Sequence, residues 1–526
     1  MSLRNHLVLP IILSTIAALA GCGSSNPTPV PPPGGGFSNS NLNGTYVFSI
    51  TGGDSNFDFM TTAGTLTADG KGNITGGTLD INDSGFSGPL TNNPITAGSY
   101  NVTADGRGTA TLATSTPFGS TIKVDFVLAT SSHGLITQFD GNATGSGTLD
   151  LQANVSQAAL AGTFVFGLSG ISGVNQVTGG TIPAAAAGVV TLDSSGAATG
   201  SMDFNNNSTP SQFLINSGSS VLVGTTPGTA TIATSSGTLN FDVYPISTTH
   251  LKIIESDSFP ILAGDVYVQT SATFPSNTVA FTMAGIDYAS QGVPMVIGGL
   301  IASDGTTISG GEEDFDDGGA TDTTPVTIGG TITPSGGRSL LQLTGLVNGN
   351  GGAPGTFTFA AYPSSGGIQL VEIDGGGVTS GVAYAQTSTS LAANQGYGFN
   401  LTAVNSTGEE DDIAEFSTAS SSITGIVDFN DQGIGPTAGQ KLTGTYTADS
   451  PASGRGVITS NSFDGAYYVV DSQTALFMQA DTTQLGIGSI QLQSASAQSN
   501  LTKSHLAMLR LKPTAKGAWK KKIKTK

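Results

Sequence analysis

The chain has 526 residues, of which 75 are glycine and only 10% are charged, and its formal net charge is −19. At roughly 150 residues per domain, this length predicts three or four domains. The acidic body excludes a nucleic-acid-binding function, because binding phosphates requires clustered lysine and arginine. Only seven basic residues occur between positions 23 and 501, namely Lys71, Arg107, Lys123, Lys252, Arg338, Lys441 and Arg455.

Residues 1–22 have the pattern of an export signal. Arg4 gives a positive start, and an apolar stretch from Leu7 to Leu19 follows that is too short to span a membrane comfortably. The next residues, Leu19-Ala20-Gly21-Cys22, resemble the lipobox of bacterial lipoproteins. That resemblance implies cleavage before Cys22 and attachment of a diacylglyceryl lipid to its thiol, with membrane binding that a further acyl chain would make stable. The alternatives are a buried free thiol and a transmembrane anchor.

Cys22 is the only cysteine, so the chain cannot form an intramolecular disulfide. An exported protein without disulfides depends on core packing and sheet hydrogen bonds. Residues 23–41 are rich in glycine, serine, proline and asparagine, which predicts a disordered tether between the membrane and the folded part. Gly23 and Ser24 follow the cysteine without an aspartate, a pattern that in enteric-type lipoproteins resembles outer-membrane sorting. We therefore expect a location in the cell envelope, at the outer membrane or the cell surface.

A short acidic stretch recurs four times along the body of the chain. Its central residues are Asp80, Asp203, Asp314 and Asp428, which lie 123, 111 and 114 residues apart. A short strand-like segment ending in glutamine closes each copy, at Gln152, Gln269, Gln386 and Gln493. Spacings of domain length predict that one fold is repeated in tandem. The predicted repeats cover residues 42–152, 160–269, 277–386 and 394–493.

The first repeat alternates apolar and polar residues as β-strands do. Tyr46, Phe48 and Ile50 share one face of its first strand, and the other repeats open in the same way. Turn sequences separate about eight segments, near residues 44–52, 58–68, 73–82, 95–103, 108–115, 121–130, 134–140 and 145–152. Eight antiparallel strands with short loops predict an all-β fold of up-and-down barrels, because closure removes exposed sheet edges. The opening Gly44-Thr45-Tyr46 resembles the first strand of lipocalin-like and avidin-like barrels, and a β-sandwich is the alternative.

The recurring acidic stretch is a candidate Ca²⁺ site. Residues 80–85 and 428–433 match the first half of the D-x-[DN]-x-[DN]-G calcium loop, although no copy supplies a bidentate glutamate at the twelfth position. Carboxylates are densest in the third repeat. The candidate ligands are Glu312, Glu313, Asp314, Asp316 and Asp317, with Asp80, Asn82, Asp428 and Asn430 in two other repeats. The alternative is that these residues end a strand and cap the following turn.

A second polar pattern recurs near the end of each repeat. It consists of Gln138 with Asp140, Glu255 with Asp257, Glu372 with Asp374, and Gln479 with Asp481. A spacing of two places both side chains on one face of a strand. They are candidates for binding a ligand's hydroxyl groups inside a barrel mouth, or for satisfying backbone donors at the rim. The exchange of glutamine for glutamate argues against a general acid.

Other chemistry has little support in the sequence. His133 and His250 lack a partner cluster with triad or zinc-site spacing, and the glycine-rich stretches join strands rather than opening a helix. Residues 494–526 break the repeat pattern, with nine basic residues and no acidic one after Thr502. They predict a disordered basic tail, or alternatively a clamp on the acidic barrels or on envelope polymers.

As a whole, the chain resembles uncharacterised tandem-β lipoproteins of soil bacteria, and this resemblance implies export rather than an activity. The first hypothesis is a non-enzymatic, lipid-anchored protein that presents four modules for adhesion, polymer binding or envelope structure, without a cofactor other than possible Ca²⁺. The second is a carrier of small apolar or sugar-like ligands in the barrel mouths. An open cavity lined by Tyr46, Phe48 and Gln138 would favour the carrier, and filled interiors would favour the first hypothesis. The third is a glycan-acting enzyme, which requires two carboxyl groups about 5–10 Å apart in one cleft.

Overall fold

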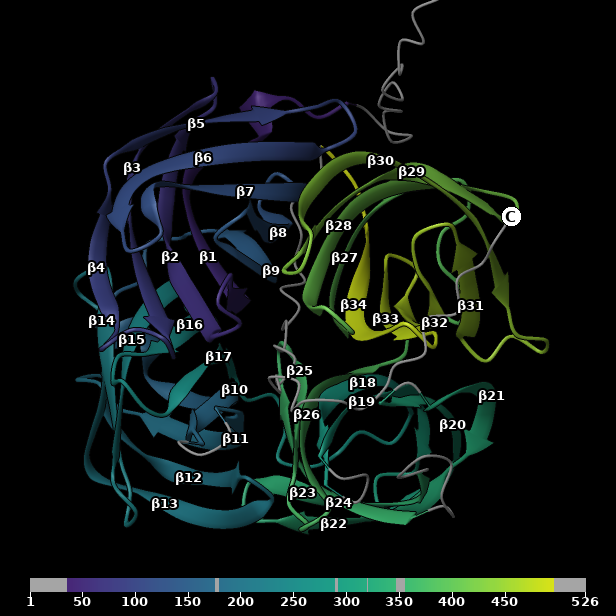
Figure 1. The fold of residues 1–526 in the computed structure, drawn as a ribbon. Helices are drawn as coiled ribbons and strands as arrows, with labels where there is room; N and C mark the ends of the chain where they lie inside the picture. The colour runs from purple at the N-terminus through teal and green to yellow at the C-terminus, as the bar shows by residue number, and fades with distance from the viewer. Residues whose placement is uncertain (1–35, 176–178, 289–291, 319, 347–354, 496–526) are drawn as a thin grey trace, which may run out of the picture.

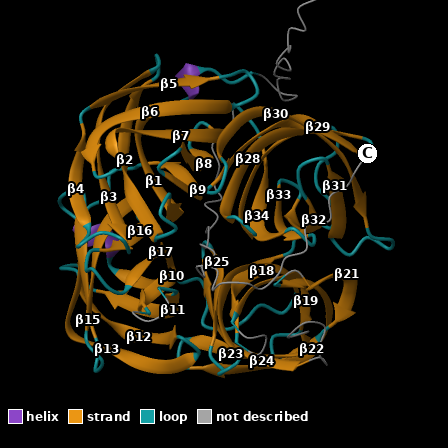
Figure 2. Cartoon of the chain, viewed as in Figure 1, coloured by secondary structure: helices purple, strands orange, loops and turns teal. Residues whose placement is uncertain are grey.

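The computed structural model describes residues 36–175, 179–288, 292–318, 320–346 and 355–495. Within them the chain forms four closed, eight-stranded antiparallel barrels in tandem, as predicted (Figures 1 and 2). Two 3-10 helices precede the first two barrels, η1 (Asn39–Asn41) and η2 (Gln157–Leu160). The predicted signal peptide with Cys22, most of the predicted tether and nearly all of the basic tail lie outside the described residues. In the part of the chain that is described, no helix has both the length and the apolar character needed to cross a bilayer.

Barrel 1 closes because β1 (Asn43–Asp54) pairs with both β2 (Phe59–Asp69) and β9 (Ala143–Leu151). Its fourth strand is interrupted, so that β4 (Leu90–Ile95) and β5 (Ala97–Val102) both pair with β3. The sequence pattern predicted only the second of these two segments. The other strands are β3 (Asn73–Asp83), β6 (Arg107–Thr116), β7 (Gly119–Thr130) and β8 (His133–Asp140).

Barrels 2 and 4 are built from eight uninterrupted strands each, in sequential order. Barrel 2 comprises β10 (Gly162–Val174), β11 (Thr181–Leu192), β12 (Ala197–Asn206), β13 (Thr209–Leu222), β14 (Gly228–Ala233), β15 (Thr238–Ser247), β16 (His250–Glu255) and β17 (Ile261–Val268). Barrel 4 comprises β27 (Gly396–Asn405), β28 (Gly408–Ala419), β29 (Ser422–Asp431), β30 (Gly435–Ala448), β31 (Arg455–Ser460), β32 (Asp464–Asp471), β33 (Thr474–Ala480) and β34 (Gln484–Leu492).

Barrel 3 repeats the interrupted fourth strand of barrel 1, here as β21 and β22, which both pair with β20. Its strands are β18 (Thr278–Asp287), β19 (Val293–Ser303), β20 (Thr307–Asp317), β21 (Ala320–Thr327), β22 (Gly329–Ser335), β23 (Arg338–Leu346), β24 (Gly355–Ser364), β25 (Gly367–Glu372) and β26 (Gly377–Ala385).

Apolar side chains fill the barrels. Tyr46, Phe48 and Ile50 belong to the core of barrel 1, as their alternation predicts. The ring of Phe48 lies over Gly64 of β2, where a Cβ atom would come within 2.9 Å of it, so this position requires glycine. In barrel 2 an apolar void of about 30 Å³, lined by residues such as Phe166, Met202 and Leu251, lies at the centre of the core.

The four barrels lie at the corners of a square and close into a ring (Figure 1). The first three strands of each barrel pack on the last three strands of the next barrel, and β27, β28 and β29 of barrel 4 pack in the same way on β7, β8 and β9 of barrel 1. This is the head-to-tail geometry that produces a closed ring when the rotation between copies closes. We call the four contacts seam 1/2, seam 2/3, seam 3/4 and seam 4/1.

Each seam contains its own apolar cluster, separate from the barrel cores. The clusters contain Val47 with Tyr244 at seam 1/2, Val165 with Tyr362 at seam 2/3, Ala280 with Tyr468 at seam 3/4, and Val127 with Ile413 at seam 4/1. The strands at a seam are therefore apolar on both faces, one facing the barrel interior and the other facing the neighbouring barrel.

Candidate functional site

The recurring aspartates reach across the seams. In the first three barrels, a tyrosine hydroxyl of the next barrel donates a hydrogen bond of 2.6 Å to this carboxylate: Tyr244 to Asp80, Tyr362 to Asp203, and Tyr468 to Asp314. At seam 4/1 the position of the tyrosine is taken by Val127, and Asp428 instead pairs with Arg107 at 3.3 Å. The aspartate of every repeat thus contacts the following barrel, and the last contacts the first.

The three arginines of the described residues all lie at seams. Arg455 donates from Nε and Nη2 to the two carboxylate oxygens of Asp314, at 2.7 and 2.6 Å, and Arg338 forms an ion pair of 2.8 Å with Asp203. Burial raises the pKa of Asp314, and the guanidinium of Arg455 opposes this shift. A buried ion pair of this kind adds little net stability, but removing one partner leaves an uncompensated charge. Each pair therefore ties a charged residue of one barrel to a charged residue of the next.

Seam 1/2 has no arginine at this position. Pro227 occupies the position equivalent to Arg107, and Asp242 lies beside Asp80. Burial, together with the nearby Asp242, raises the pKa of Asp80 to about 7. Seam 4/1 has a similar pair, where burial and the charge of Asp428 raise the pKa of Asp125 to about 8. At both of these seams, which include barrel 1, a second aspartate thus lies beside the recurring one.

The asparagines two residues after the aspartates bind main-chain carbonyls of the next barrel. The side-chain amide of Asn82 donates to Glu255 O at 2.9 Å and to Asp257 O at 2.7 Å. In the equivalent contacts, Asn205 donates to Glu372 O and Gly377 O, both at 2.9 Å, and Asn430 donates to Gln138 O at 2.9 Å and Asp140 O at 3.1 Å. At seams 1/2, 2/3 and 4/1 the two recurring polar patterns of the sequence therefore contact each other.

The side chains of the second pattern satisfy donors at the barrel ends. Glu255 Oε1 accepts from Asn240 N at 3.0 Å, and Glu372 Oε2 accepts from Thr379 N and Oγ1 at 3.0 and 2.8 Å. The paired aspartates of three repeats accept main-chain turn amides: Asn142 N to Asp140, Gly376 N to Asp374 and Thr483 N to Asp481. In the second repeat, Asp257 accepts from the side-chain amide of Asn240. Gln479 donates to Asp481 at 2.5 Å. Ligand binding by these residues stays a prediction.

Burial explains why glutamine and glutamate exchange at these positions. It raises the pKa of Glu255 to about 9 and that of Glu372 well above its ordinary range, with the neighbouring aspartates adding to both shifts. A glutamate with such a pKa is protonated at neutral pH. It then offers a donor and an acceptor, as Gln138 and Gln479 do.

The glutamine that closes each repeat also crosses a seam. Its amide donates to a carbonyl of the next barrel at 2.8 to 2.9 Å: Gln152 to Pro245 O, Gln269 to Gly337 O, Gln386 to Val469 O, and Gln493 to Asp105 O. The bond from Gln493 runs from the last barrel back to the first and helps to close the ring.

The acidic strand of barrel 3 follows this plan only in part, because Asp316 stands where the other three repeats have the asparagine. Asp314 lies at seam 3/4, and Glu313, Asp316 and Asp317 are fully buried beside it on β20, while Glu312 is half-buried. Calcium binding by the nine residues named from the sequence stays a prediction.

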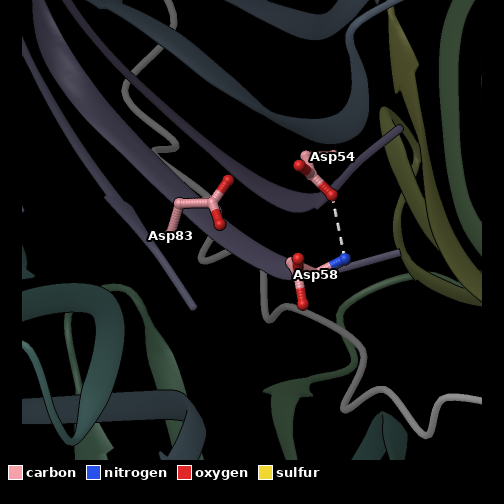
Figure 3. A group of neighbouring side chains, drawn as sticks. All are labelled: Asp54, Asp58 and Asp83. Carbon is pink, nitrogen blue, oxygen red and sulfur yellow. Dashed lines mark hydrogen bonds between the residues drawn. The ribbon is translucent and has the colours of Figure 1, made fainter. Parts of the chain in front are cut away.

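A different group of carboxylates converges in barrel 1. Asp54, Asp58 and Asp83 have oxygens within 4.8 Å of one another, and within the described ranges this is the one group of three or more metal-ligating residues with that geometry (Figure 3). Sequence reasoning missed it, because Asp54 and Asp58 flank the first turn and Asp83 ends the third strand. Comparing the position of Asp54 between repeats would not have singled it out, since Asp287 stands there in barrel 3, with Ser172 in barrel 2 and Asn405 in barrel 4.

The two histidines of the described residues, His133 and His250, have carboxylate partners that the sequence did not reveal. His133 Nδ1 lies 2.7 Å from Asp150, and His250 Nε2 lies 2.7 Å from Asp265, which also pairs with Lys252 at 3.0 Å. All five residues are buried, so a polymeric substrate cannot reach them.

A cleft of about 860 Å³ opens beside barrel 3, in the size range of small-molecule sites. The segment that joins barrels 2 and 3 forms one wall, and strand ends of barrels 3 and 4 form the other. Many of its side chains carry hydroxyl groups, including Ser271, Thr273, Ser276 and Ser365, and Tyr384 adds an aromatic ring.

Comparisons with known proteins place few limits on function. No family model matches the sequence, and no curated protein matches it. The structure is distantly similar to the crystal structure of a mutant of transferrin binding protein B, a vaccine antigen, from Haemophilus parasuis Hp5. The identity is 8%, the match covers 69% of this chain and 83% of that chain, and the TM-score is 0.18. We draw no conclusion about this chain from a likeness of that size.

Proposed function

We propose that the chain is a lipid-anchored, non-catalytic protein of the cell envelope that binds an extended, hydroxyl-rich polymer. Its four barrels act as one rigid scaffold. The observation that carries this proposal is the use of both recurring polar patterns to join neighbouring barrels, as in the contact of Asn205 with Glu372 O. Residues that recur in every repeat are the ones that a repeated catalytic or ligand site would use, and here they hold the ring together.

The filled barrels favour this proposal over a carrier of small ligands. Tyr46 and Phe48, which would line an open cavity, are buried in the core of barrel 1. The void in barrel 2 is about 30 Å³, whereas ligand sites measure about 300–1,000 Å³.

The cleft beside barrel 3 is the place where we expect the polymer to bind. Its hydroxyl-bearing lining and the ring of Tyr384 suit the hydroxyl groups and apolar ring faces of a glycan. Asp304 and Asp471 are the charged residues of its lining, so a neutral or cationic polymer fits better than an anionic one. The lipid on Cys22 and the tether after it would hold this cleft at the envelope surface.

Filling the cleft tests the proposal. Ser276 and Ser365 are exposed on its two walls, so tryptophan at both positions should leave the fold intact. We expect Ser276→Trp/Ser365→Trp to lower the affinity of the detergent-solubilised full chain for isolated envelope polysaccharide at least tenfold in a pull-down titration.

The matched control is Ser235→Trp, at an exposed turn of barrel 2, which should bind as the wild type does. Equal binding by the cleft-filled variant, or no binding by the wild type, would contradict the assignment. Release of reducing ends from the polysaccharide would contradict a non-catalytic role.

A further inference from the structure

The carboxylates of Asp54, Asp58 and Asp83 meet at one end of barrel 1 (Figure 3). Asp54 Oδ1 is held in place by the main-chain amides of Asn56 and Asp58, at 2.8 and 2.9 Å, and Asp83 Oδ1 accepts from Gly85 N at 2.7 Å. The side chain of Asp83 is only 2% exposed, and its Oδ2 atom has no hydrogen-bond partner. A buried carboxylate oxygen without a donor is costly, and a cation would remove that cost.

At the equivalent place in barrel 4, the carboxylate has the hydrogen-bond donors that Asp83 Oδ2 lacks. There Asp431 Oδ1 accepts from Gly433 N at 2.6 Å, as Asp83 does from Gly85. Its Oδ2, however, accepts from the amide of Asn405 at 2.9 Å and from the hydroxyl of Thr407 at 3.0 Å. The same amide donates to Glu410 at 2.7 Å, so it bridges two carboxylates.

In barrel 2 the two equivalent positions carry neutral side chains that hydrogen-bond to each other. Ser172, at the position of Asp54, donates its hydroxyl to Asn206 Oδ1 at 2.6 Å, and Asn206 stands at the position of Asp83. Barrels 2 and 4 thus place a donor where barrel 1 places a third carboxylate.

We propose that Asp54, Asp58 and Asp83 bind one Ca²⁺ ion, which takes the place of the amide donor of barrel 4. Mg²⁺ is usually held by one or two carboxylates and keeps several waters, whereas Ca²⁺ accepts a larger and less regular set of oxygen ligands. Three carboxylates with oxygens within 4.8 Å of one another therefore suit Ca²⁺. Asp54 Oδ2 accepts a hydrogen bond of 2.8 Å from the side-chain amide of Asn56. Ser55 and Gly85 are exposed next to the carboxylates, where water can complete the coordination shell.

The site adjoins seam 4/1. The main-chain carbonyl of Asp54 accepts a hydrogen bond of 2.6 Å from the side-chain amide of Gln432 in barrel 4. Holding the first turn of barrel 1 in place with an ion would therefore also hold the surface on which barrel 4 docks.

Calorimetric titration of the detergent-solubilised full chain with CaCl₂ tests the proposal. We expect one ion per chain at this site, with a dissociation constant of about 0.1–1 mM, as in extracellular calcium modules. Asp83→Asn and Asp58→Asn should each weaken binding at least tenfold. Asp54→Asn copies the arrangement of barrel 4, so it should lose the ion while circular dichroism shows an unchanged fold.

The matched control is Asp431→Asn, which changes the equivalent aspartate of barrel 4 and should leave calcium binding as in the wild type. Unchanged binding in a folded Asp54→Asn or Asp83→Asn variant would overturn the proposal. Loss of binding in Asp431→Asn, or tighter binding of Mg²⁺ than of Ca²⁺, would also overturn it.

Discussion

Glu255 and Gln138 occupy equivalent positions in two barrels, and burial makes them chemically alike. With a pKa of about 9, Glu255 is protonated in the folded chain at neutral pH and ionised in the unfolded chain. The folded state therefore binds a proton that the unfolded state lacks. Between the ordinary pKa of glutamate and about 9, this carboxyl group lowers the stability of the fold as the pH rises.

We therefore expect Glu255→Gln to stabilise the protein more at pH 8 than at pH 5. The glutamine keeps an oxygen that can accept from Asn240 N, and it removes the proton uptake, which changes stability by up to about 1.4 kcal/mol per pH unit. Urea unfolding followed by circular dichroism at both pH values measures the difference. A variant that is less stable than the wild type at pH 8, or whose unfolding free energy differs from that of the wild type by the same amount at both pH values, would show that Glu255 is ionised in the fold.

At the scale of single strands, the sequence predicted the barrels well. The alternation of Tyr46, Phe48 and Ile50 marks the inward face, because apolar side chains on one face of a strand must be buried. The sequence did not reveal that the fourth strand of barrels 1 and 3 is interrupted, since in barrel 1 residues 90–94 fall between the predicted segments 73–82 and 95–103. Residues 90–94 pair with β3 through backbone hydrogen bonds, which do not depend on side-chain pattern.

Removing one side-chain amide should destabilise the protein more at a seam than on the adjacent surface. Asn205 is fully buried and donates two hydrogen bonds to barrel 3, whereas Asn206, the next residue of β12, is exposed. We expect Asn205→Ala to cost about 1–3 kcal/mol of unfolding free energy, because it leaves two buried carbonyls without donors. Asn206→Ala removes one exposed hydrogen bond, from Ser172, and should cost less, about 0.5–1 kcal/mol. Thermal unfolding compares the two variants, and equal losses would show that the two buried seam bonds contribute no more stability than one exposed hydrogen bond.

At the scale of the whole molecule, the recurrence of both polar patterns was visible in the sequence, but their contact was not. Asn82 and Glu255 meet across a separation of 173 residues in different repeats, and a repeat pattern cannot tell contact within one copy from contact between copies. For the same reason the acidic stretches invited a calcium interpretation, while the group that converges in space combines Asp54 and Asp58 with Asp83. Charge density along the chain does not report which strand ends meet.

Closure of the ring is the central claim, and a cross-link between the first and last barrels tests it most directly. A Cβ atom built on Gly398 lies 3.8 Å from Cβ of Val127, within the separation of about 3.5–4.5 Å that a disulfide requires. In a Cys22→Ser chain, we expect Val127→Cys/Gly398→Cys to form an intramolecular disulfide during oxidative refolding, seen as faster migration on a non-reducing gel. Val127→Cys/Ala280→Cys, which uses the equivalent position of barrel 3, should stay reduced. Failure of the first pair to cross-link, or equal cross-linking of both pairs, would contradict a closed ring.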